Sequence, residues 1–265
     1  MSWLLLGILF VGGSIVFAIA GILVARKFMH KHVAEGHNEV LAPLFLTAGV
    51  LYAVLLAFMV IAMWEFYDAA KANTAQEASL LVPLYRQSMV MAPEKGEEMR
   101  HLLREYSESV VNGWERFRET GQGSARARMT VDKMVYVFST LTPATKPREL
   151  VAAQFLTTFS DLMLARNKRL LHASESLSWI MWVAVIGGGL VTVGMSFGLF
   201  MDHVGPQLVM TSVLSALIGL LLVLMVVLNK PFVGPLGIHP EPFEASLRLF
   251  DQIDDDFKKI ASEAR

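Results

Sequence analysis

Cysteine is absent from this chain of 265 residues. Its absence excludes disulfides, cysteine nucleophiles and cysteine metal sites, and the redox compartment therefore has no signature in the sequence. Charged residues are also missing over long distances: no Asp, Glu, Lys or Arg occurs in residues 1–25, 40–64, 176–201 or 203–229. The net charge is −1, so no basic field predicts nucleic acid as a partner.

The four uncharged stretches predict four transmembrane helices. Each stretch exceeds the roughly 20 apolar residues that cross a bilayer core. The hydrophobic share of 54% is above that of ordinary soluble domains. We therefore expect the lipid bilayer to be a partner and place the spans at about Trp3–Ala25, Val40–Trp64, Leu177–Phe200 and Pro206–Leu228.

The first span has one alternative interpretation, a cleaved signal peptide. Ala18–Ala20 has the small-x-small pattern of a cleavage site. The leader before it carries no positive charge, however, and the apolar run continues to Val24. We therefore favour a helix that stays in the protein.

The region between the second and third spans is patterned for helices. Its clearest apolar stripe has helical spacing and consists of Met99, Leu103, Tyr106, Val110, Trp114 and Phe117. Gly121 and Gly123 stop this helix, and Pro147 is placed to start a later one. We expect the second span to continue as a helix to Met91, with a bend at Pro83.

The predicted fold class is all-α: a polytopic membrane protein with four transmembrane helices and a helical extramembrane domain inserted between helices two and three. The expected divisions are residues 1–64 (spans one and two with a polar hairpin), 65–175 (the helical domain), 176–229 (the hairpin of spans three and four) and 230–265 (an exit loop and a tail helix). The tail helix is amphipathic, with an apolar stripe formed by Phe250, Ile253, Phe257 and Ile260.

Positive charges near the span ends favour a cytoplasmic location for the helical domain, with Lys71, Arg166 and Lys230 on its side. The basic hairpin between spans one and two, with Arg26 and Lys27, argues for the opposite orientation.

None of the spans has an ionisable side chain in its middle. Coupled transporters, intramembrane enzymes and redox carriers need polar groups at that depth, so we expect no enzymatic activity. A channel remains compatible, because a hydrophobic constriction can gate a pore by dewetting. Four apolar helices enclose no wet pore alone, so the pore would form on the axis of an oligomer. The candidate constriction on span two is Leu51, Leu55, Phe58 and Ala62.

Small residues predict close helix packing, either within one subunit or between subunits. They recur every four residues on span two and again on span three, at Gly49, Ala53, Ala57, Gly194 and Gly198.

Three charged clusters carry no predicted catalytic, cofactor or metal site. The histidines His30, His32 and His37 match no metal-binding spacing and indicate a solvated loop. The acidic cluster around Asp254 lacks the order of an EF-hand, so we interpret it as the solvated face of the tail helix. The basic cluster of Arg166, Lys168 and Arg169 is typical of a segment flanking a membrane.

The fourth span ends in the sequence NKPFVGPLGIHPEPF, residues 229–243. Proline donates no backbone hydrogen bond and disfavours helix before it, so Asn229, Lys230, Pro231, Phe232 and Gly234 form a predicted membrane exit motif. We expect Lys230 to reach the head groups, Phe232 to lie in the membrane interface, and the tail to dock on the helical domain.

These segments together resemble the bestrophin-like integral membrane family. The similarity covers about Leu46–Phe243, and its more specific parts are the Glu77-Ala78 pair and the Asn-Lys-Pro-Phe-x-Gly exit at residues 229–234. The resemblance implies a bacterial protein of the inner membrane with four spans.

The chain is more distantly similar to true bestrophins, which are pentameric, calcium-gated anion channels with a hydrophobic neck on span two. Those proteins have Asn-Pro-Phe-Gly followed directly by acidic residues. This chain has one residue inserted, at Lys230, and its acidic cluster begins only at Asp251.

The resemblance implies a homo-oligomeric ion channel, pentameric by analogy, that passes anions. The alternative is a membrane-anchored interaction protein, whose helical domain binds a partner while the spans only anchor it. A lipid-modifying enzyme is disfavoured, because no polar site is evident in the sequence.

Overall fold

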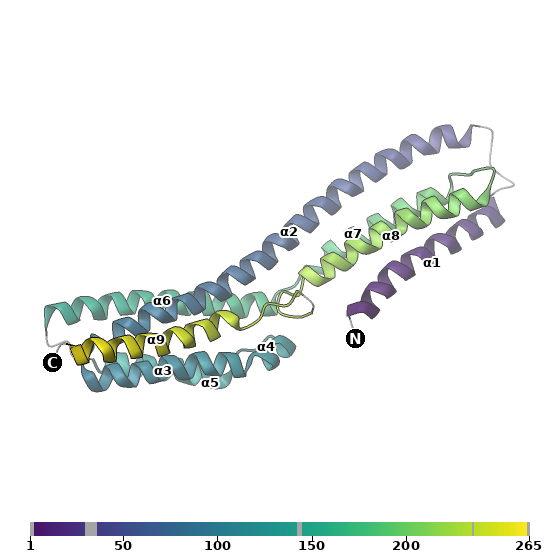
Figure 1. Ribbon diagram of the computed structural model, residues 1–265. Coiled ribbons are helices and arrows are strands. Elements are labelled where there is room, and N and C mark those ends of the chain that lie inside the picture. Colours follow the sequence, from purple (N-terminus) through teal and green to yellow (C-terminus); the bar gives the residue numbers. More distant parts are fainter. Residues whose placement is uncertain (1–2, 30–35, 142–144, 235, 264–265) are drawn as a thin grey trace. The chain divides into compact units, whose positions relative to one another are not determined.

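The computed structural model describes residues 3–29, 36–141, 145–234 and 236–263, and contains no strand among them. These residues form the helices α1 (Trp3–Met29), α2 (His37–Ser88), α3 (Pro93–Asn112), α4 (Trp114–Thr120), α5 (Ala125–Ser139), α6 (Lys146–Ser174), α7 (Trp179–Phe197), α8 (Val204–Leu228) and α9 (Glu241–Glu263) (Figure 1). The predicted all-α class is therefore confirmed.

The chain divides into two compact units. Unit 1 comprises Met1–Tyr67 and Ser176–Lys230, and unit 2 comprises Asp68–Glu175 and Pro231–Arg265. The helix α2 belongs to both units and runs unbroken through Pro83. The tail is thus assigned to the same unit as the region between spans two and three, rather than to a segment of its own.

Unit 1 contains four helices that are long and apolar enough to cross a membrane: α1, α2, α7 and α8. α1 packs along α7 and α8. The shared core is formed by Ala18, Tyr52, Leu56, Met59, Met63, Val185, Val193, Ile218, Met225 and Leu228. The predicted spans are therefore present as helices.

Glycines allow the closest helix approaches within unit 1. A side-chain carbon built on Gly188 of α7 would lie 2.7 Å from the ring of Tyr52 on α2. One built on Gly219 of α8 would lie 3.1 Å from the backbone oxygen of Phe10 on α1. Only glycine leaves room for these neighbours.

Polar contacts hold the end of α1 and the start of α2 to the α7–α8 connection of unit 1. Arg26 at the end of α1 donates to the side-chain oxygen of Gln207 at 2.8 Å and to the backbone oxygen of Met201 at 2.6 Å. Asn38 exchanges two hydrogen bonds with the backbone of Phe200. The end of α1 and the start of α2 are therefore both fixed to the α7–α8 connection.

Unit 2 is a bundle formed by α3–α6, the C-terminal part of α2, and α9. The whole predicted stripe from Met99 to Phe117 is buried, as expected for a core face. Its helix is interrupted at Gly113, so two helices, α3 and α4, stand where one was predicted. α4 ends at Gly121, whose φ of 69° lies in the left-handed region, and α6 begins with Pro147 in its first turn.

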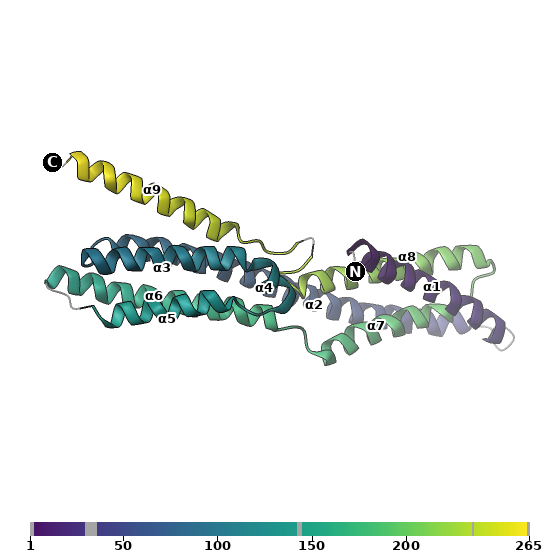
Figure 2. The ribbon, with the colours of Figure 1, turned by 90° about the horizontal axis from the view of Figure 1, so that it is seen from below.

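α9 packs on unit 2 through its N-terminal half, which confirms that the tail docks there. Phe250 is fully buried and stacks on Tyr85 at a centroid distance of 4.2 Å. Figure 2 shows α9 diverging from its neighbours toward its C-terminal end. Phe257 and Ile260 are correspondingly 53% and 63% exposed, so only half of the predicted apolar stripe is buried.

Candidate functional site

One face of α2 is the predicted wall of a pore, and unit 1 leaves most of it uncovered. Leu51 and Phe58 are 69% and 68% exposed, and Ala62 is also exposed. Leu55 is half-buried and packs against the core of unit 1. The four positions are spaced by four, three and four residues and so share one side of the helix. Such a column is apolar and can exclude water, and its role as a constriction stays a prediction.

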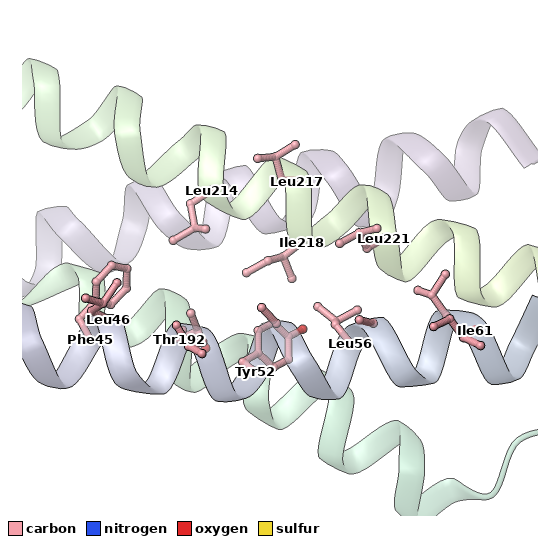
Figure 3. A pocket seen from close by; sticks show the side chains of 15 residues that line it. Phe45, Leu46, Tyr52, Leu56, Ile61, Thr192, Leu214, Leu217, Ile218 and Leu221 are labelled. Atoms are coloured by element: carbon pink, nitrogen blue, oxygen red, sulfur yellow. The ribbon is translucent and has the colours of Figure 1, made fainter.

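The small residues Gly49, Ala53 and Ala57 line an apolar groove of unit 1 with a volume of about 710 Å³ (Figure 3). Side chains of α2, among them Tyr52 and Leu56, face those of α8 across the groove. A side-chain carbon built on Gly49 would meet nothing within 4 Å. The groove can take up an apolar chain or helix, but offers no charge to an ion.

The two glycines predicted on span three differ in their surroundings. A side-chain carbon on Gly198 would lie 2.7 Å from Leu41 of α2, whereas one on Gly194 would meet nothing within 4 Å. Both line a second, smaller apolar pocket of unit 1, together with Phe17 and Phe197.

The exit motif begins at the end of unit 1. The side-chain oxygen of Asn229 accepts a hydrogen bond from the backbone N–H of Leu177 at 2.8 Å. This bond ties the end of α8 to the residues that precede α7. Lys230 is exposed, in agreement with a side chain that can reach head groups.

The rest of the exit motif is packed within unit 2. Phe232 is only 2% exposed, and its ring lies 4.9 Å from that of Phe117 and 6.0 Å from that of Trp114. The expectation that Phe232 lies in the membrane interface is therefore wrong, because these aromatic rings bury it. Pro231 accepts a hydrogen bond from Ile238, and Gly234 has a φ of 98°, so the segment folds into a tight loop.

A buried ion pair lies beside this loop. Arg169 of α6 donates from Nε to one carboxylate oxygen of Glu77 at 2.6 Å and from Nη2 to the other at 3.0 Å. The hydroxyl of Tyr106 on α3 donates to the same carboxylate at 2.6 Å. The three side chains thereby join α2, α3 and α6.

Aromatic rings enclose the guanidinium of this pair. The central carbon of Arg169 lies 4.8 Å from the ring centre of Phe117, 5.6 Å from that of Trp114 and 5.7 Å from that of Phe243. Ring faces attract a cation, most strongly where water is excluded. Phe243 in the first turn of α9 therefore covers the ion pair, while Phe232 of the loop packs on the same ring of Phe117.

Burial raises the pKa of the Tyr106 phenol well above its usual range, and the negative charge of Glu77 raises it further. Burial by itself lowers the pKa of Arg169, but the attraction of Glu77 outweighs it, so the pKa of Arg169 is raised. Tyr106 therefore stays a neutral donor and Arg169 stays a cation. The side chains of this cluster use one another as hydrogen-bond partners. The cluster therefore suits a role in stabilising the fold better than a role in proton transfer.

The sequence interpretation missed this cluster. It assigned Arg169 to a membrane-flanking basic segment, whereas Arg169 is buried. A signal was present: Glu77 lies on the buried face of α2 between Thr74 and Leu81, where an apolar residue is the rule.

A second network holds α9. Arg104 of α3 contacts Asp251 at 2.7 Å and Asp254 at 3.4 Å, and Tyr85 donates to Asp254 at 2.7 Å. Two members of the acidic cluster thus serve ion pairing and do not lie on a purely solvated face. The described residues contain no group of three or more His, Asp or Glu side chains that could hold a metal ion. His30 and His32 lie outside the described residues.

Comparison with known proteins agrees with this architecture. A family model described as the Bestrophin-like domain matches residues 12–243, which run from α1 to the first turn of α9. No curated protein and no solved structure matches the chain. The matched region includes the apolar helices of unit 1, the Glu77–Arg169 pair and the exit loop. This chain, a multi-pass integral membrane protein, belongs to the bestrophin-like family.

Proposed function

We propose that the protein is an oligomeric ion channel that passes anions, with α2 along the axis of the oligomer. The observation that carries this proposal is the uncovered face of α2 in unit 1, with Leu51 and Phe58 mostly exposed. Around an axis, the column Leu51, Leu55, Phe58 and Ala62 would form a ring of apolar side chains. Such a ring closes a pore by dewetting and opens when it widens.

The proposed assembly is a homo-oligomer, pentameric by analogy with bestrophins, in the inner membrane of a bacterium. The groove between α2 and α8 supports an assembly, because its small residues leave space that a neighbouring helix can fill. We also propose that unit 2 is the extramembrane part and lies in the cytoplasm. Its bundle carries exposed ion pairs such as that of Arg104 with Asp251, which suit an aqueous setting.

The test combines symmetry with ion flux. We expect the purified protein to form rings with rotational symmetry in detergent, and to release chloride from reconstituted vesicles. Phe58→Ala shortens the apolar ring and should raise the flux or change its anion selectivity. Leu220→Ala is the matched control, because Leu220 is 58% exposed but lies on α8. A monomer without flux would contradict the channel.

A membrane-anchored interaction protein is the second candidate. Unit 2 favours it by exposing large apolar side chains on α5, where Met129 and Tyr136 are 59% and 69% exposed. These residues are seven apart and therefore share one side of the helix. This candidate predicts a monomer without flux, and a protein partner whose binding is lost on Tyr136→Ser.

We propose no enzymatic activity. The buried ionisable groups Glu77, Tyr106 and Arg169 satisfy one another and leave no member free for a substrate.

A further inference from the structure

One side of α6 carries a row of large apolar side chains that unit 2 leaves uncovered. Leu156, Leu164 and Leu171 are 50%, 55% and 53% exposed. They are eight and seven residues apart and therefore lie on one side of the helix. In a part of the protein that we place in water, such a row indicates an interaction surface. We call this side the α6 face, and its exposed charged residues are Asp161, Lys168 and Glu175.

The part of α2 that belongs to unit 2 exposes a side of a different character. Lys71, Ala75, Ser79 and Arg86 are exposed there. They are four, four and seven residues apart and so share one side of the helix, which we call the α2 face. Large side chains of one helix pack into the grooves of another, and the small side chains of Ala75 and Ser79 leave such a groove open. The leucines of an α6 face therefore fit the α2 face in shape.

Within one chain, α2 and α6 run antiparallel in a constant register. Asn73 contacts His172 at 3.1 Å, and Gln87 contacts Thr158 at 3.4 Å. The step along α2 between these contacts equals the step back along α6. Each residue of α2 therefore has a counterpart on α6 at its own height in the bundle.

A ring built by rotation keeps every residue at its own height along the ring axis. The proposed channel has α2 along that axis, so the same register relates α2 of one copy to α6 of the next. Lys71 then stands level with Glu175 to within one residue. Arg86 stands level with Asp161 to within two residues, or about 3 Å of helix rise.

The charges at these heights are opposite. Lys71 and Arg86 are the cations of the α2 face, and Glu175 and Asp161 are the anions of the α6 face. None of the four has an ion-pair partner within the part of the chain that the structure describes. All four are therefore available to pair with another copy.

The uncharged residues match in the same register. Leu171 stands level with Ala75, so a large side chain meets a small one. Lys168, the remaining charged residue of the α6 face, stands level with the exposed and neutral Gln76. The register therefore brings no like charges together.

We propose that the α2 face of one copy packs on the α6 face of the next copy. This inference rests on the proposed homo-oligomer and names the surfaces that build it outside the spans. Two different surfaces meet at each contact, so the contact repeats from head to tail and closes into a ring rather than a two-fold dimer. The leucines are buried between the helices, and the two charge pairs fix the register.

Disulfide cross-linking tests the contact, and the absence of native cysteine keeps the background low. Full-length Ala75→Cys and Leu171→Cys, each with its own tag, are expressed together and oxidised in the membrane. We expect a covalent dimer that carries both tags, and at least about 10-fold less covalent dimer from either variant alone, because a disulfide needs Cα atoms within about 7 Å. Met129→Cys replaces Leu171→Cys in the control, since Met129 is 59% exposed but lies on α5.

Charge reversal tests the register. Arg86→Glu brings like charges together across the contact and should lower the oligomeric fraction in detergent about 3-fold or more. Addition of Asp161→Arg to the same chain should restore that fraction. Arg128→Glu is the control, because Arg128 is exposed on α5 and belongs to neither face.

The outcomes separate this interface from the channel. Rings without the cross-link between Ala75→Cys and Leu171→Cys would overturn the interface and leave the channel standing. The cross-link in a protein without chloride flux would support the interface and count against the channel. A protein that stays monomeric would overturn both.

Discussion

Arg169 holds both carboxylate oxygens of Glu77, at 2.6 and 3.0 Å, and the two side chains are only 4% and 0% exposed. The partners are 92 residues apart in the sequence, on α6 and α2. A pair so deeply buried is costly to break, because either charge alone keeps its desolvation cost without its partner.

Glu77→Gln should therefore destabilise unit 2 strongly. Loss of one partner from a buried pair costs about 3–5 kcal/mol, which corresponds to roughly a 10 °C lower melting temperature in a chain of this size. The double variant Glu77→Leu, Arg169→Met should lose less than the sum of the single losses. Thermal unfolding in detergent measures the melting temperatures of Glu77→Gln, of the single variants Glu77→Leu and Arg169→Met, and of the double variant. Glu98→Gln, which breaks the exposed pair with Lys95, is the control and should change little.

Alkaline pH should weaken unit 2 through Tyr106. Since its pKa is raised in the folded protein, the neutral phenol is favoured there, and this stabilisation is complete below the unfolded pKa of about 10. It is lost as the pH rises above about 10 toward the higher folded pKa. Tyr106→Phe should lower stability at pH 7 and flatten the alkaline decline. An alkaline decline as steep in Tyr106→Phe as in the parent protein would count against this assignment.

The glycines of unit 1 should differ in their tolerance of a side chain. Gly188→Ala places a carbon 2.7 Å from the ring of Tyr52 and should lower the melting temperature by several degrees. Gly49→Ala meets open space and should leave the stability of unit 1 unchanged or slightly raised. The order of the two melting temperatures is decisive, and the reverse order would contradict the packing described for α2 and α7.

Removal of Arg104 should loosen α9. Arg104→Gln loses the ion pairs with Asp251 and Asp254, whose combined value at this partly exposed site is about 1 kcal/mol. Limited proteolysis should then cut α9 several-fold faster. Arg248→Gln changes an exposed arginine on α9 itself and is the control. Equal cleavage rates for the two variants would show that Phe250 packing alone retains the helix.

The elements that local patterns define were predictable. Long uncharged stretches predict the membrane helices. Each segment that crosses the bilayer must be apolar over its own length and must satisfy its own backbone hydrogen bonds. The buried apolar stripe from Met99 to Phe117 was equally predictable, because helical spacing is a local property of the sequence. The exact break at Gly113 was not, since a glycine inside a helical pattern is often tolerated.

Contacts between distant segments were not predictable. The docking of Phe232 on Phe117 and the pairing of Arg169 with Glu77 depend on how the helices come together. A basic cluster before a span and a phenylalanine after one have the same local pattern whether they face head groups or a protein core. The divergence of α9, which exposes Phe257, likewise follows from packing and not from its amphipathic pattern.

The hydrogen bond between Leu177 and Asn229 has a consequence for protein engineering. The α7–α8 hairpin leaves and rejoins the rest of the chain at two residues that are joined by this hydrogen bond, so its two ends lie close together. We therefore expect that a linker of a few residues can join the two ends of the remaining chain after the hairpin is removed. We also expect that the hairpin can be exchanged between members of the family as one segment.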